Sequence, residues 1–283
     1  LESRKTFDMK TRFRVQPRCF GFYNFNGESF STAEIEEICI QTNSLSYADY
    51  RECRFLTLTV EIFNNDGLFR DLIQFLWHYQ INQAEFILRI HKYLLHDKGV
   101  IAQYYNEYKN EEENDLWENS EELKTHLSNP EIIKEYIKGN RGNNELYKYR
   151  AIVVFHHMNE LHDVAYAVAQ ELLQEKKVLD EKTQHYLDEL KGISILRKKD
   201  FLEDQTFEEI FHYDFSQLTE NHYKDYPFDF ACPEGIRLKI YHTEPQRVIA
   251  KGGIDQYGSS LVGLARILGR VKSADLHRTV KSN

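Results

Sequence analysis

Apolar and polar residues alternate along the first part of the chain, which is the pattern of a strand with one buried face. Phe13 and Val15 stand between polar neighbours, and the run KTRFRVQPRCFGFYNFNGESF continues in the same way. Asn26-Gly27 interrupts the run with a strong signal for a two-residue hairpin turn. The pattern predicts a strand or loose hairpin over residues 11–30.

A helical period replaces the alternation after Ser46. In SYADYRECRFLTLTVEIFNN the apolar residues recur every three to four positions, although those between residues 56 and 62 also alternate with a period of two. The length of the segment decides for a helix, since strands are mostly shorter than about ten residues. Ser46 and Asp49 have the spacing of a capping box, and Gly67 suits the left-handed end of a helix.

Further segments repeat the helical pattern. A short helix is expected after Ser31 or Thr32. Others are expected at residues 68–80, 84–97, 100–128 with a break near Asn114, from Pro130, at 144–176, 180–199, from Thr243, and at 259–271. Alternation returns at residues 207–215 and 236–240, where we expect short strands. The expected fold class is mainly α, with an N-terminal strand or hairpin and short strands near residues 207–242.

Composition and charge narrow the class of protein. The 283 residues carry a formal net charge of −9, which disfavours nucleic-acid binding because that binding depends on Lys and Arg. No apolar run approaches the ~20 residues of a transmembrane segment. The four cysteines have no paired spacing, so we expect a reduced, cytoplasmic protein. Residue 1 is Leu and not Met, and the opening segment LESRKTFDMKTRFRV begins in the middle of a structural pattern without a capping signal. We therefore expect a fragment of a longer polypeptide.

The segment FHHMNELHD holds the densest group of candidate metal ligands. In one continuous helix, His156, Glu160 and Asp163 would share a face. Helical dimetal sites repeat a Glu-x-x-His pair on two helices, whereas the order differs here and a second copy is missing. His157 and His162 are five residues apart, which does not fit the HExxH geometry. We interpret the group as a solvated or packing face and not as a metal site.

The remaining candidates also have structural interpretations. Cys53 has no activating partner in its helix and is expected to be a buried small residue, and Cys19 is interpreted as structural. The segment KGGIDQYGSS lacks the lysine of a phosphate-binding loop and is interpreted as a turn between two helices. Arg12, Arg14 and the basic segment GRVKSADLHRTVK are interpreted as surface or as contacts to a neighbouring domain. We therefore predict no catalytic, cofactor-binding or metal-binding residue in the chain.

Two parts of the sequence resemble the C-terminal region of cobalamin-binding radical S-adenosylmethionine (SAM) proteins. The first runs from TRFRVQPRCFGFYNFNGESF through EEICIQTNSLSYADYRECRFLTLTVEIFNNDGLF. The second runs from EGIRLKIYHTEPQRVIA to GSSLVGLARILGRV. Residues 100–205, between them, resemble no family.

The resemblance implies a radical SAM barrel and a cobalamin-binding domain upstream in the same polypeptide. Such proteins bind a [4Fe-4S] cluster through a C-x-x-x-C-x-x-C motif, and SAM at the open iron. Cys19, Cys39, Cys53 and Cys232 lie too far apart to form that motif, so no catalytic residue carries over to this chain. The cluster, SAM and cobalamin are expected in the parent protein. Residues 1–30 are then the end of an upstream barrel domain or a connecting hairpin, and residues 31–283 a helical accessory domain with a small β element.

Two functional hypotheses result. The chain is a non-catalytic accessory or scaffold region of a cobalamin-dependent radical SAM enzyme, or it is a free-standing helical protein-interaction module. The 18 Tyr and 18 Phe residues suit the second hypothesis, because aromatic side chains are frequent at interfaces. We also expect residues 11–30, without their neighbours, to promote association, so that deletion of residues 1–30 improves solubility.

Overall fold

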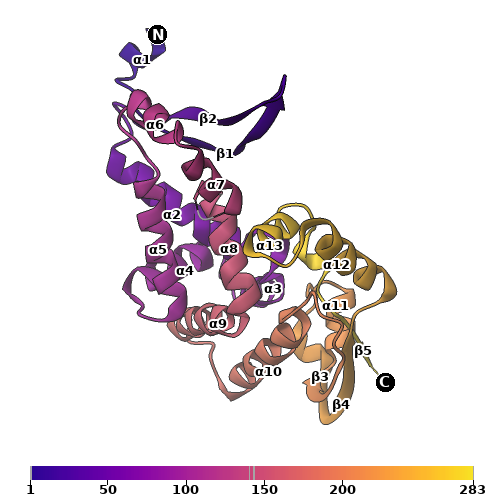
Figure 1. The fold of residues 1–283 in the computed structure, drawn as a ribbon. Coiled ribbons are helices and arrows are strands. Elements are labelled where there is room, and N and C mark those ends of the chain that lie inside the picture. Colours follow the sequence, from indigo (N-terminus) through magenta and orange to yellow (C-terminus); the bar gives the residue numbers. More distant parts are fainter. Residues whose placement is uncertain (1, 140, 143, 283) are drawn as a thin grey trace. The chain divides into compact units, whose positions relative to one another are not determined.

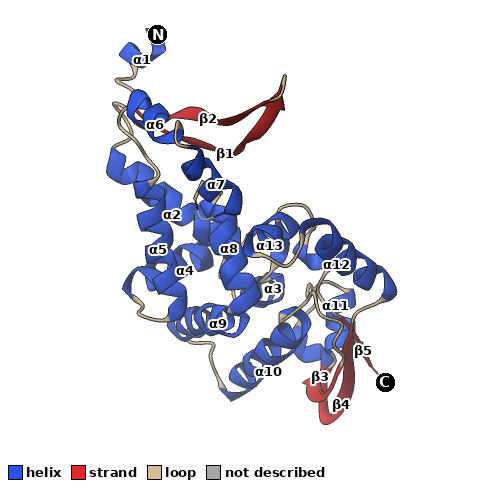
Figure 2. Ribbon diagram, viewed as in Figure 1, coloured by secondary structure: helices blue, strands red, loops and turns tan. Residues whose placement is uncertain are grey.

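The structure, a computed structural model, describes residues 2–139, 141–142 and 144–282. It divides the chain into two compact units. The N-terminal unit comprises Leu1–Leu58 and Tyr104–Tyr149, and the C-terminal unit comprises Thr59–Gln103 and Arg150–Asn283. Among the described residues helices predominate, and the strands form two small antiparallel sheets (Figure 1, Figure 2). The predicted fold class, mainly α with minor β structure, is confirmed.

The N-terminal unit combines a long hairpin with helices. Its elements are α1 (Glu2–Thr6), β1 (Lys10–Phe25), β2 (Glu28–Gln41), most of α2 (Tyr47–Phe63) and of α5 (Val100–Asn114), α6 (Ser120–Leu127), α7 (Pro130–Lys138) and the start of α8 (Glu145–His156). The predicted break near Asn114 is confirmed, since α5 ends there and α6 begins at Ser120.

The hairpin turn lies where the sequence predicts it. Asn26 and Gly27 have φ values of 52° and 84°, which a two-residue turn of type I′ requires at both positions. The strands β1 and β2 pair from Phe25↔Glu28 to Lys10↔Gln41, so the hairpin is longer than expected.

The prediction of a short helix after Ser31 or Thr32 is wrong, because residues 28–41 form the strand β2. Ala33 pairs with Phe20 and Ile35 pairs with Val15 across the hairpin. These long-range backbone bonds and the packing of Ile35 against a hydrophobic core outweigh the weak local helical pattern.

The base of the hairpin is part of the core of the N-terminal unit. Val15 is 5% exposed and packs with Leu123 and Leu127 of α6 and with Ile133 and Tyr136 of α7. Deletion of residues 1–30 would uncover this cluster. The structure thus gives a physical reason to expect the opposite of the predicted gain in solubility, because the deletion would expose buried apolar surface.

The start of α2 follows the predicted capping box. Ser46 Oγ accepts a hydrogen bond from the Asp49 N–H (3.2 Å), and Asp49 Oδ2 accepts one from the Ser46 N–H (3.1 Å). The expectation that Cys53 is buried is wrong, since it is exposed. The buried stripe of α2 instead runs through Phe55, Leu58 and Ile62, which places Cys53 on the opposite side of the helix.

The C-terminal unit combines helices with a three-stranded sheet, much of whose surface is exposed. Its strands are β3 (Phe207–Tyr213), β4 (Ala231–Tyr241) and β5 (Thr279–Ser282), in the order β3-β4-β5. Its helices include α3 (Arg70–Trp77), α4 (Gln83–His96), α9 (Met158–Glu175), α10 (Glu181–Lys198), α11 (Phe215–Glu220), α12 (Glu244–Tyr257) and α13 (Leu261–Leu268). Short 3₁₀ turns are η1 (Asn65–Gly67), η2 (Pro227–Phe230) and η3 (Ser273–Asp275). None of the described helices is long and apolar enough to cross a bilayer.

Two expected elements of this part of the chain differ in the structure. The helix expected at 144–176 is interrupted at His157, which has φ −134° and separates α8 from α9. The turn expected at KGGIDQYGSS is largely helical, because α12 continues to Tyr257. A Cβ atom at Gly253 would lie 3.4 Å from the Ile267 side chain, so this glycine allows α12 and α13 to pack closely.

A buried arginine fixes the segment that follows α10. Arg278 is fully buried, and its five N–H donors all meet main-chain carbonyl oxygens. The acceptors are the carbonyls of Leu196, Lys199, Asp200, Glu203 and Gln205, at 2.6–3.2 Å. These include carbonyls at the C-terminal end of α10, which have no partner within the helix.

We predict that Arg278→Lys lowers the free energy of unfolding by about 3–5 kcal/mol, measured by urea denaturation. The lysine side chain carries only three donors, all on one nitrogen. It therefore cannot reach all five carbonyl oxygens that surround the planar guanidinium of Arg278. The matched control is Arg270→Lys at an exposed position, which should change stability by less than about 0.5 kcal/mol. Equal effects of the two substitutions would contradict the role assigned to Arg278.

Candidate ligand-binding site

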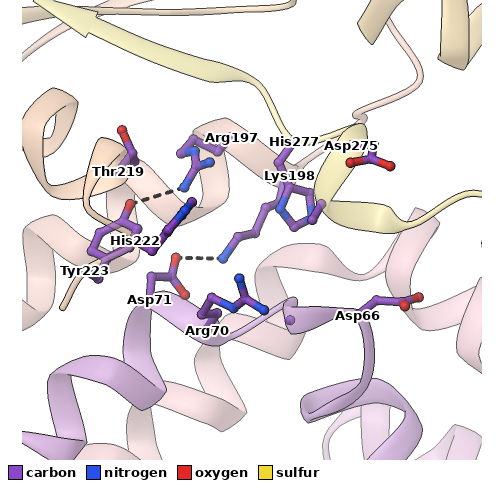
Figure 3. A pocket seen from close by; sticks show the side chains of 12 residues that line it. Asp66, Arg70, Asp71, Arg197, Lys198, Thr219, His222, Tyr223, Asp275 and His277 are labelled. Atoms are coloured by element: carbon purple, nitrogen blue, oxygen red, sulfur yellow. Dashed lines mark hydrogen bonds and ion pairs between the residues drawn. The ribbon is translucent and has the colours of Figure 1, made fainter.

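A cavity of about 330 Å³ opens in the C-terminal unit (Figure 3). Four chain segments that are far apart in sequence line it. They lie at residues 66–71, 197–198, 219–223 and 274–277. The first contains η1 and the start of α3, and the second is the last turn of α10, so regular elements hold its polar side chains.

The cavity wall contains strained backbone. Asp66, His222 and Tyr223 have φ values of 57°, 59° and 60°, in the left-handed region that non-glycine residues rarely adopt. Gly67, beside Asp66, has φ +69°. Strained residues of this kind concentrate at functional sites, so the cavity is a candidate for one.

A buried ion pair forms the floor. Lys198 Nζ donates to Asp71 Oδ2 at 2.7 Å, and both side chains are 2% exposed (Figure 3). Ser194 Oγ donates to the same Asp71 oxygen at 2.7 Å and accepts from Lys198 Nζ at 2.5 Å. Each charge therefore has its opposite charge and a further polar partner.

Burial works to raise the pKa of Asp71, but the charge of Lys198 and the two hydrogen bonds outweigh it and lower the pKa to about 2. Burial lowers the pKa of Lys198, and the Asp71 charge opposes that change. Because Lys198 stabilises the charged form of the Asp71 carboxylate, both members of the pair are ionised at neutral pH.

His162 extends this network away from the cavity. Its Nδ1 donates to the Met158 carbonyl at 2.8 Å, and its Nε2 lies 3.0 Å from Ser194 Oγ. Burial, followed by the charge of Lys198, lowers the pKa of His162 to about 3, so the ring is neutral. The Ser194 hydroxyl proton therefore has two acceptors, Asp71 Oδ2 and His162 Nε2.

The trio of Ser194, His162 and Asp71 does not have the geometry of a catalytic triad. In a triad the histidine stands between the serine and the carboxylate, whereas Ser194 stands between the other two here. Ser194 is also fully buried, so a substrate cannot reach its hydroxyl. The arrangement stabilises the structure and sets the polarity of the cavity floor.

The buried ring of His277 packs against Phe201 and also lines the cavity. It is 5% exposed and lines the cavity, and its Nε2 has no hydrogen-bond partner among the described residues. Burial, and then the positive charges of Lys198 and Arg197, lower the pKa of His277 well below its usual value. The neutral ring presents a polar atom whose hydrogen-bonding capacity is not used within the described chain.

Two arginines of the cavity lining, Arg70 and Arg197, form no ion pair with a carboxylate among the described residues. Arg197 donates to the Arg278 carbonyl (3.0 Å) and to the Tyr223 hydroxyl (3.2 Å), both neutral groups. Arg70 makes no hydrogen bond or ion pair with the described residues and lies over Gly67, where a Cβ atom would be 3.4 Å from Arg70 Nε. Figure 3 shows Arg70 directed toward the pair of Asp71 and Lys198.

Two of the three carboxylates around the cavity form an ion pair with a basic side chain. Asp66 binds Arg150, and Asp71 binds Lys198. Asp275 on the rim has no ion-pair partner among the described residues. The uncompensated groups are thus two arginines and one aspartate, an arrangement that can hold a small anion such as phosphate or a carboxylate.

Of the residues considered in FHHMNELHD, His157 and Glu160 lie close together, with His157 Nδ1 3.6 Å from Glu160 Oε1, but His156, Glu160 and Asp163 do not share one continuous helix. His156 ends α8, whereas Glu160 and Asp163 belong to α9 beyond the break at His157. Asp163 instead pairs with Lys191 of α10 at 2.6 Å. The four cysteines are free thiols. Arg12 and Arg14 form ion pairs with Glu118 and Glu36, within the N-terminal unit.

A second group of buried titratable residues lies in the N-terminal unit. The carboxyls of Asp115 and Glu145 share a hydrogen bond, and burial followed by the Asp115 charge raises the pKa of Glu145. One proton is therefore held between the two carboxyls at neutral pH. Glu145 is 3% exposed and Asp115 is half-buried, and we interpret the pair as structural.

Sequence reasoning missed the cavity residues because their neighbours in space are distant in sequence. Asp71 and Lys198, for example, are 127 residues apart. No known protein family matches the sequence, and no curated protein is similar to it at a significant level.

We predict that the buried pair produces acid sensitivity. The folded-state pKa of Asp71 lies below its unfolded value, so its contribution to stability is present above about pH 4 and is lost as the pH falls toward 2. Asp71→Asn should cost about 3–5 kcal/mol at pH 7, because it leaves Lys198 buried without an opposite charge. The difference between wild type and variant should shrink by roughly 2 kcal/mol below pH 4, measured by denaturant unfolding across pH.

Two further variants separate the charge effect from general damage. Asp163→Asn breaks an exposed pair between α9 and α10 and should cost less than about 1 kcal/mol. The double variant Asp71→Leu with Lys198→Met should be more stable than Asp71→Asn alone, since no charge then remains unpaired. A pH-independent difference between wild type and Asp71→Asn would refute the assignment.

Proposed function

We propose that the chain is a non-catalytic accessory region of a cobalamin-dependent radical SAM enzyme. Its partner is the upstream barrel and cobalamin-binding domain of the same polypeptide. The parent protein, and not these residues, binds the [4Fe-4S] cluster, SAM and cobalamin. The resemblance of residues 11–69 and 234–271 to that family supports the proposal.

The exposed end of the hairpin is the observation that carries the proposal. Tyr23, Phe25 and Phe30 are 58%, 75% and 45% exposed. Tyr23 lies directly opposite Phe30, and Phe25 is two residues from Tyr23, so the three rings share one face of the hairpin. Figure 1 shows this end of the hairpin projecting away from α6 and α7. We call these three residues the aromatic face.

The aromatic face fits a protein partner. Clustered exposed aromatic side chains are typical of docking surfaces, and they lose most of their contact with water when a partner covers them. β2 carries no third strand on its outer side among the described residues, so its backbone is open to pairing as well. The segment that forms this surface belongs to the first of the two segments with the family resemblance, which favours the upstream barrel as the occupant.

We predict that the DNA on the 5′ side of the codon for residue 1 encodes a barrel with the C-x-x-x-C-x-x-C motif. When that part and the present chain are produced as separate proteins, they should associate. The triple variant Tyr23→Ser, Phe25→Ser, Phe30→Ser should weaken the association at least about tenfold, measured by calorimetry, because aromatic anchors dominate interface energies.

The control is the double variant Leu95→Ser, Val248→Ser, which removes exposed apolar residues elsewhere and should leave the association unchanged. An initiation codon directly before residue 1, without a barrel sequence, would overturn the proposal. It would favour the alternative, a free-standing helical protein-interaction module. Association that is indifferent to the triple variant would also overturn the role of the aromatic face.

The cavity favours a second candidate function, the binding of a small anion. The specific observation is Arg70, a cation with no hydrogen-bond or ion-pair partner among the described residues, in the lining of a cavity that also contains Arg197, which hydrogen-bonds only to neutral groups. Guanidinium groups bind phosphate and carboxylate through paired hydrogen bonds. This function is compatible with an accessory role and does not require chemistry by the chain.

We predict that inorganic phosphate stabilises the protein through Arg70. At a concentration tenfold above its Kd, phosphate should add roughly 1.4 kcal/mol to the free energy of unfolding. Arg70→Gln should abolish this gain, whereas Arg270→Gln, an exposed arginine outside the cavity, should preserve it. Acetate in place of phosphate tests a carboxylate ligand. Stabilisation of Arg70→Gln equal to that of the wild type, with both anions, would exclude the site.

A further inference from the structure

Two histidines and a glutamate converge between α10 and β3. His185 and Glu189 are four residues apart on α10 and so lie on the same face of that helix. His212 belongs to β3, which packs beside α10. One possible ligand atom from each of the three residues lies within 4.8 Å of the others. In the described part of the chain, no other group of three or more His, Cys, Asp or Glu residues meets this condition.

The contacts already hold the three groups close to ligand geometry. His212 Nδ1 is 2.7 Å from Glu189 Oε1, and His185 Nε2 is 3.6 Å from the same oxygen. Zinc binds imidazole nitrogen and carboxylate oxygen at about 2.0–2.2 Å, so tetrahedral ligand atoms lie roughly 3.3 Å apart. Small side-chain adjustments bring both distances to that value, with the ion in place of the proton between His212 and Glu189.

The glutamate is oriented by the backbone. Both Glu189 oxygens accept a hydrogen bond from the His212 N–H, at 3.1 and 2.8 Å. Such bonds to a ligand carboxylate reduce its freedom to rotate and hold it toward the ion. The ring centroids of His185 and His212 are 5.3 Å apart, so both rings face the same space.

We propose that His185, Glu189 and His212 bind a divalent transition-metal ion. Two imidazoles and one carboxylate suit zinc, and also nickel or copper. The side chains of His185 and His212 are 51% and 47% exposed, whereas that of Glu189 is 15% exposed. The ion therefore enters from the solvent side and keeps at least one coordination position for water or another ligand. Bound metal connects the helix α10 to the sheet.

This site is independent of the proposed accessory function and of the anion cavity. The cavity uses the last turn of α10, at Arg197 and Lys198, whereas His185 and Glu189 lie in its first half. The failure of one proposal therefore leaves the other intact.

The test is a titration of the chelator-treated full chain with Zn²⁺, followed by calorimetry. The wild type should show one more zinc site than His212→Gln or His185→Gln, or affinity at least about tenfold higher than either. Cys39 and Cys53 are exposed thiols, but they are present in all variants, so their zinc binding cancels in the comparison. X-ray absorption at the zinc edge of the wild type should show two imidazole ligands.

Matched controls test whether exposed histidine or carboxylate alone explains binding. His96→Gln removes an exposed histidine of α4, and Glu209→Gln removes an exposed carboxylate of β3. Both should bind zinc like the wild type. Two results would overturn the proposal. One is equal zinc binding by wild type, His185→Gln and His212→Gln, and the other is an equal loss in His96→Gln. Because His185 is half exposed, its variant keeps the test valid if His212→Gln fails to fold.

Discussion

The guanidinium of Arg278 donates five hydrogen bonds to carbonyls between residues 196 and 205. No carboxylate takes part, so the positive charge is held by main-chain dipoles at and beyond the end of α10. A buried charge tolerates little displacement of its partners, because each lost bond leaves an unsatisfied group. Arg197, Lys198 and His277 are sequence neighbours of the bonded groups, so the position of the cavity follows from the same interaction.

Some charged side chains in the C-terminal unit form an ion pair with an opposite charge, and others do not. This difference distinguishes the structural ion pair of the cavity from the residues that we propose bind a ligand. Asp71 and Lys198 neutralise each other, at a desolvation cost that an apolar pair would avoid. An apolar pair would also make the cavity floor apolar, whereas the ion pair and Ser194 keep it polar. Arg70 forms no ion pair within the described chain, and this is the basis of the proposal that an external anion binds there.

Local signals in the sequence were sufficient wherever a few adjacent residues determine the structure. Asn26-Gly27 forms the hairpin turn, the capping box at Ser46 begins α2, and α12 begins directly after Thr243, all as expected. Residues 31–39 show the limit of such signals, because their strand depends on pairing with β1. Cys53 shows another, since the pattern in α2 fits two registers and only packing selects the stripe through Phe55.

The two candidate sites show why function was less accessible to sequence reasoning than fold. The spacing of His185 and Glu189 is visible in the sequence, but their third partner, His212, follows only from the packing of β3 on α10. The cavity has even less signal, because Arg70 and His222 belong to segments with no shared motif. A lone arginine or histidine is ordinary in a chain of this charge. Each becomes informative only when the fold shows which charges remain without a partner, and that depends on every contact around them.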